Sequence, residues 1–92
     1  MSGVLWDYKI HADAYPSLKK IGPSDAAKVR AYLDKRIKGC VDPRAFGKPL
    51  RRELKGLWRY RVEGIRIICR LQDHVAIVMV LEAGHRSIVY PD

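Results

Sequence analysis

The segment from residue 57 to residue 71 constrains the fold most, because it predicts a β-hairpin of fixed register. Two apolar-rich runs, Leu57–Val62 and Ile65–Leu71, flank the dipeptide Glu63-Gly64. A two-residue loop with glycine is typical of hairpin turns, since glycine adopts the positive φ that such turns need. In this register one apolar face is expected to carry Trp58, Tyr60, Val62, Ile65, Ile67 and Cys69. We therefore expect Trp58 and Tyr60 to pack in the core rather than to stack on bases.

Four arginines fall on the opposite face of the same hairpin, namely Arg59, Arg61, Arg66 and Arg70. The register places Arg61 directly across from Arg66, and like charges in that arrangement destabilise a sheet. An anion that binds both guanidinium groups would relieve the repulsion between them and would itself be bound tightly. The alternative is neutralisation by a nearby carboxylate, for which the candidates are Glu53, Glu63 and Glu82.

The remaining patterns predict an α+β fold. The period of two in Val4–Ile10 indicates an N-terminal strand. Two helices are expected to follow and to form a helical hairpin. The first is capped by Asp13 and ends at Gly22-Pro23, and the second runs from Ser24 to Gly39. Further strands are expected at Val75–Leu81, as a central strand covered on both faces, and at Ser87–Tyr90. The helices should pack on one face of a single antiparallel sheet.

Length and composition bound the class of protein. A chain of 92 residues without a stretch of eighteen apolar residues is expected to form one soluble domain, residues 1–92, and the absence of a secretory pattern at its N-terminus favours the cytoplasm. A net charge of +8 favours a polyanionic partner, although an acidic protein surface would also satisfy it. Cys40 and Cys69 lack metal-ligand spacing, so they are expected to be reduced, and no metal or cofactor is expected.

These cations suit cleavage of RNA without a metal. In that reaction the 2′-OH attacks the adjacent phosphate, so the site needs a base, cations for the pentavalent phosphorane, and an acid for the leaving oxygen. Arginine can stabilise the phosphorane, but its pKa above about 12 makes it a poor proton carrier. The candidates for proton transfer are Tyr90, His85 and Glu53, and Arg86 adds a further cation.

Several segments together resemble the RelE/ParE toxin superfamily, on its RelE branch: Gly47-Lys48-Pro49-Leu50, Glu53 to Val62, Arg66-Ile67-Ile68, Gly84-His85-Arg86 and Val89-Tyr90. The resemblance covers nearly the whole chain. It implies a ribosome-dependent endoribonuclease toxin of a type II toxin–antitoxin system, which cleaves mRNA in the ribosomal A site and so inhibits translation.

The same resemblance implies roles for single residues. Arg66 and Arg86 match the arginines that hold the scissile phosphate, and Tyr90 matches the C-terminal catalytic tyrosine. Arg61 and His85 are further candidates for the catalytic group, His85 because family members carry lysine or histidine there. The residues expected to bind RNA are Arg59, Arg61, Lys55, Arg51 and Arg52.

The implied partners are a RelB-like cognate antitoxin, rRNA of the ribosome and mRNA, with no membrane and with no DNA except through an antitoxin complex. Two other functions stay open. A ParE-like toxin would poison DNA gyrase, which is a protein-binding role on the same fold. A non-catalytic relic would bind RNA or an antitoxin only.

Overall fold

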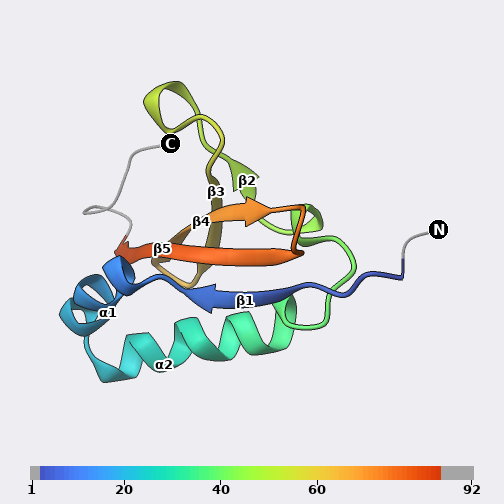
Figure 1. The fold of residues 1–92 in the computed structure, drawn as a ribbon. Helices are drawn as coiled ribbons and strands as arrows, with labels where there is room; N and C mark the ends of the chain where they lie inside the picture. Colours follow the sequence, from blue (N-terminus) through green and yellow to red (C-terminus); the bar gives the residue numbers. More distant parts are fainter. Residues whose placement is uncertain (1–2, 86–92) are drawn as a thin grey trace.

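The computed structural model describes residues 3–85, which form a five-stranded sheet and a helical layer (Figure 1). The sheet order is β1-β5-β4-β3-β2. The strands are β1 (Asp7–Ile10), β2 (Lys48–Pro49), β3 (Trp58–Val62), β4 (Ile65–Gln72) and β5 (Ile77–His85). The helical segments are η1 (Ala12–Ala14), α1 (Tyr15–Ile21), α2 (Pro23–Tyr32), the π-helical turn η2 (Leu33–Ile37), and the 3-10 turns η3 (Pro43–Ala45) and η4 (Arg52–Leu54). Among these described residues, no helix has the length and apolarity needed to cross a bilayer.

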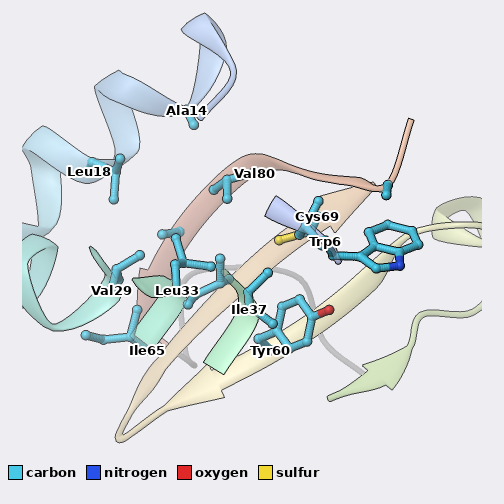
Figure 2. Packing of buried hydrophobic residues seen from close by; sticks show 14 residues of the cluster. Trp6, Ala14, Leu18, Val29, Leu33, Ile37, Tyr60, Ile65, Cys69 and Val80 are labelled. Carbon is cyan, nitrogen blue, oxygen red and sulfur yellow. The ribbon is translucent and has the colours of Figure 1, made fainter. Parts of the chain in front are cut away.

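The two helices lie along one face of the sheet, which confirms the predicted α+β arrangement (Figure 1). Val29, Leu33 and Ile37 recur at four-residue spacing and are fully buried, so the apolar stripe of α2 continues through η2. They meet Tyr60 and Ile65 from the sheet in the main core (Figure 2). Gly22, with a φ of 93°, separates the helices, and α2 begins at Pro23, one residue before the predicted start at Ser24.

The sheet is mixed rather than fully antiparallel. β1 pairs in parallel with β5, whereas the β5-β4, β4-β3 and β3-β2 pairs are antiparallel. The prediction of an antiparallel sheet was therefore wrong for β1. The helical hairpin between β1 and β5 provides the crossover that a parallel pair requires.

The β3–β4 hairpin has the predicted register, with Tyr60 opposite Ile67 and Arg61 opposite Arg66. The turn itself differs in one respect. The positive φ, 54°, belongs to Glu63, whereas Gly64 does not have a positive φ. A non-glycine residue in this region carries some backbone strain.

Other predicted boundaries need correction. β1 begins at Asp7 rather than Val4. Asp13 does not cap α1, whose N-cap is Ala14; instead His11 caps the 3-10 turn η1, where its Nδ1 accepts a hydrogen bond from the Asp13 backbone amide at 3.0 Å. β5 begins at Ile77, and Val75 is 53% exposed in the preceding turn. Within residues 3–85, helices cover β5 on one face only. The two-residue strand β2 was not predicted, and the strand predicted at residues 87–90 lies outside the described part of the chain.

The connection between η3 and β2 passes very close to β3 at Gly47. A β-carbon at this position would collide with the backbone oxygen of Arg59 and would lie 2.8 Å from Trp58 Nε1. The φ of Gly47, 71°, also favours glycine. The indole of Trp58 donates a hydrogen bond to the Phe46 carbonyl at 2.7 Å, which holds this segment against the sheet.

Replacing Gly47 by alanine should therefore destabilise the fold strongly. We expect Gly47→Ala to lower the free energy of unfolding by about 2 kcal/mol or more beyond the loss in Gly39→Ala, measured by urea denaturation. Gly39 is the matched control, since it has a φ of 82° but open space around its α-carbon. Equal losses in the two variants would show that the close approach at Gly47 contributes nothing.

Candidate functional site

The face of the sheet opposite the helices carries four arginines, which we call the arginine face: Arg59 and Arg61 of β3, and Arg66 and Arg70 of β4. Arg61 lies directly opposite Arg66, next to the hairpin turn, as predicted. Arg59 and Arg66 are only 7% and 4% exposed, whereas Arg61 and Arg70 are exposed. The arginine face thus combines two buried arginines with two that are exposed to solvent.

A second, smaller apolar cluster covers part of this face. Leu50 and Ile68 are buried there, and Leu54 and Leu57 pack against them. Ile68 lies between Arg66 and Arg70 on β4, so the cluster fastens the segment around η4 onto the arginine face. The sequence patterns predicted no element for residues 51–56. The leucines at positions 50, 54 and 57 were the signal for this packing.

The fastened segment brings the predicted RNA-binding residues to the arginine face. Arg51, Arg52 and Lys55 are exposed on it. Arg52 has a positive φ of 59°, a conformation that non-glycine residues adopt rarely and that is often found at functional sites. Glu53, one of the predicted proton carriers, is exposed on the same turn.

A basic recess of about 220 Å³ opens beside this segment, and its lining residues are Lys48, Pro49, Leu50, Arg51 and Arg59. The register sets Lys48 of β2 opposite Arg59 of β3. Three cationic side chains around one recess form a place where a phosphate could be bound by charge-assisted hydrogen bonds. The arginine face therefore extends from the hairpin turn to the edge strand β2.

His85 lies on the other face of the sheet. Its register partner is Ile65, which is buried in the main core, and its Nε2 lies 3.1 Å from Asp25 Oδ2 at the start of α2. The reason is a β-bulge: Ile68 and Cys69 are adjacent on β4 but face Glu82 and Val80, so Leu81 is an extra residue on β5. The bulge reverses the alternation beyond it. The structure therefore does not bring His85 together with Arg61 and Arg66.

The other candidates divide as follows. Arg86 and Tyr90 lie outside the described residues, so their predicted roles stay predictions. Glu63, considered as a neutralising carboxylate, lies 3.0 Å from Lys28 Nζ of α2. Cys40 and Cys69 are free thiols, as predicted, and burial raises the pKa of Cys69. Residues 3–85 contain no group of three potential metal ligands.

Three tyrosines of the described fold, Tyr8, Tyr32 and Tyr60, are poor candidates for proton transfer. Burial, together with a 2.6 Å hydrogen bond to Asp34, raises the pKa of Tyr8 to about 12. Burial also raises the pKa of Tyr32 and of Tyr60, whose hydroxyl donates to the Pro43 carbonyl at 2.8 Å. These upward shifts disfavour ionisation near neutral pH. The three side chains act in packing, as the sequence predicted for Tyr60.

A small α+β domain with two helices on one face of its sheet and basic residues on the other is the architecture of RelE/ParE superfamily toxins. Residues 8–90 match the family described as "ParE toxin of type II toxin-antitoxin system, parDE". The match spans most of the 92 residues. The chain belongs to this toxin family.

Individual relatives carry RelE-type names. The chain is similar to toxin RelG of Mycobacterium tuberculosis, with 39% identity over 49 residues, and the matched region spans only 56% of that protein and 53% of this chain. It is also similar to a chain of the toxin–antitoxin complex RelBE2 from M. tuberculosis, with a TM-score of 0.80, 29% identity, and coverage of 94% of this chain and 97% of that chain. YafQ from E. coli shares the fold, with a TM-score of 0.61, 16% identity, and coverage of 94% and 99%.

Loss of a leucine from the small cluster should release the basic segment. We expect Leu54→Ala to accelerate trypsin cleavage after Arg51, Arg52 and Lys55 several-fold, because local opening of this segment then costs about 1 to 2 kcal/mol less. Mass spectrometry of timed digests would measure this. Leu5→Ala, at a leucine that is 61% exposed, is the control. Equal cleavage in both variants would refute the fastening role of Leu54.

Proposed function

We propose that this protein is a ribosome-dependent endoribonuclease that cleaves mRNA in the A site without a metal. The observation that carries the proposal is the direct cross-strand pairing of Arg61 with Arg66 on the face that the helices leave open. Two guanidinium groups at adjacent strand positions can bind one phosphate from two sides. The relatives named RelG and RelBE2 support the RelE branch of the superfamily.

In the proposed reaction, the 2′ oxygen forms a bond to the adjacent phosphorus while the bond from phosphorus to the 5′ oxygen breaks. Arg61 and Arg66 stabilise the additional negative charge of the phosphorane, together with Arg86 as the resemblance implies. A base must take the 2′ proton and an acid must supply one to the leaving oxygen. Tyr90 and Glu53 are the better candidates for these roles, because His85 contacts Asp25 on the opposite face.

RNA on either side of the scissile phosphate would lie along the rest of the arginine face. Arg59 and the exposed cations of the η4 segment, Arg51, Arg52 and Lys55, offer contacts to further phosphates of mRNA or rRNA. Such contacts add affinity that falls steeply with salt. The same basic surface suits a RelB-like antitoxin with acidic segments, and the complex containing the RelBE2 toxin supports a partner of that kind. The proposed place of action is the cytoplasm.

A second function is favoured by one observation, the match to the ParE toxin family. A gyrase poison would bind a protein rather than a phosphodiester, and would not need Arg61 paired with Arg66. A non-catalytic relic would bind RNA or antitoxin without arresting growth. The cross-strand arginine pair favours the nuclease over both.

Cleavage on programmed ribosomes tests the proposal. Wild-type protein should cut A-site mRNA, and Arg66→Ala should cut it about a hundredfold or more slowly, because a preorganised cation is lost from the transition state. Arg66→Lys should recover only part of the rate, since lysine keeps the charge but not the bidentate geometry. Primer extension would map and time the cuts.

The control is Lys35→Ala, which removes an exposed cation from the helical layer and should leave the rate unchanged. Equal cleavage by wild type and Arg66→Ala would sink the role of the arginine pair. Inhibition of DNA supercoiling by gyrase, with intact mRNA on the ribosome, would establish the ParE-type function instead. Absence of growth arrest on expression would indicate a relic.

A further inference from the structure

The first turns of α2 connect the ends of two strands on the side of the sheet opposite the arginine face. Asp25 Oδ2 lies 3.1 Å from His85 Nε2 at the end of β5, and Asp25 Oδ1 lies 3.8 Å from Lys28 Nζ. Lys28 Nζ in turn lies 3.0 Å from Glu63 Oε1 in the β3–β4 turn. One chain of polar contacts thus joins helix α2, the hairpin turn and the last described residue of β5.

Both tethered points border the proposed site. Glu63 follows Arg61 by two residues and precedes Arg66 by three. Its positive φ of 54° is a strained backbone conformation, which persists only when the surrounding structure supports it. His85 immediately precedes Arg86 in the sequence. A shift at either point would therefore displace a cation that the proposed reaction uses.

At the end of β5, support on the helical side comes from α1 rather than from β1. β1 ends at Ile10, which pairs with Val80, so β1 leaves the following residues of β5 unpaired on that edge. There Ser17 Oγ accepts a hydrogen bond from the Ala83 backbone amide at 3.0 Å. A cavity of about 200 Å³ lies beside this contact, lined by Ser17, Lys20, Ile21, Glu82, Ala83, Gly84 and His85. The contact with Asp25 adds a side-chain tether at His85, which also pairs with Ile65 of β4.

We propose that Asp25 and Lys28 are positioning residues, which set the relative geometry of the hairpin turn and the end of β5 and so align the cations of the cleavage site. The inference rests on the proposed nuclease function. It gives His85 a role in holding the strand end rather than in carrying a proton. The Asp25 and Lys28 side chains act through His85 and Glu63. Neither Asp25 nor Lys28 is expected to touch RNA.

The energetics separate positioning from stability. The Lys28 and Glu63 side chains are 43% and 65% exposed, and ion pairs of this kind change stability little. Catalysis depends far more steeply on geometry, because displacements of about 1 Å can slow a reaction by up to a hundredfold. Loss of these contacts should therefore reduce the rate of cleavage much more than it reduces the stability of the fold.

Single-turnover cleavage on programmed ribosomes, with each variant at saturating concentration, tests this inference. Asp25→Ala and Lys28→Ala should each lower the rate constant at saturation about tenfold. In a titration of each variant, the protein concentration that gives half the maximal rate should change less than twofold. Lys28→Arg should keep the rate within about twofold of wild type, since arginine can reach both carboxylates.

The matched control is Asp34→Ala. Asp34 is also a carboxylate of the α2–η2 helical segment with a side-chain partner on the sheet, the Tyr8 hydroxyl at 2.6 Å, but it lies away from the hairpin turn. Its loss should lower the melting temperature at least as much as Asp25→Ala and leave the cleavage rate unchanged. A rate loss in Asp34→Ala equal to that in Asp25→Ala would overturn the inference, because stability alone would explain it.

Two further results are decisive. Wild-type rates in Asp25→Ala and Lys28→Ala, with cleavage by Arg66→Ala still slowed about a hundredfold or more, would refute the positioning role and leave the nuclease function intact. Absence of cleavage by the wild-type protein itself would refute the nuclease function, and the positioning role with it.

Discussion

The register of the β3–β4 hairpin is the constraint on which the arginine face depends. Tyr60 and Ile67 are fully buried opposite each other, so a slip by one residue would turn the apolar set toward solvent. This packing sets Arg61 and Arg66 opposite each other on the other face. The core therefore fixes the relative position of the two cations on which the proposed function rests.

The two faces of the sheet have different roles: one holds the main core, and the other carries the arginines. The helices, the main core and the contacts of Asp25 and Lys28 lie on one face and fix the positions of the strands. On the other face, the small cluster of Leu50, Leu54, Leu57 and Ile68 fastens a basic segment beside the arginines. The small domain in this way gathers its arginines on the face of the sheet opposite the main core, two of them buried and two exposed.

Local patterns were sufficient to predict some features and not others. The hairpin register and the helical layer follow from residue alternation and four-residue spacing, which are properties of neighbouring positions. The face of His85 could not be predicted, because the bulge at Leu81 arises from pairing between β4 and β5 and reverses the alternation. The parallel position of β1 likewise depends on where the chain returns after the helices. The positive φ of the hairpin turn was predicted for Gly64 from turn preferences alone, whereas in the structure it belongs to Glu63.

The central claim is that the arginine face binds the mRNA phosphate that is cut. A cryo-EM structure of the protein on a ribosome programmed with 2′-O-methylated A-site codon, in which the attacking oxygen is blocked, tests it most directly. We predict density for an mRNA phosphate between Arg61 and Arg66, with the η4 segment toward the flanking RNA. Contact of RNA with the helical face, or an A site that stays empty at saturating protein, would contradict the account.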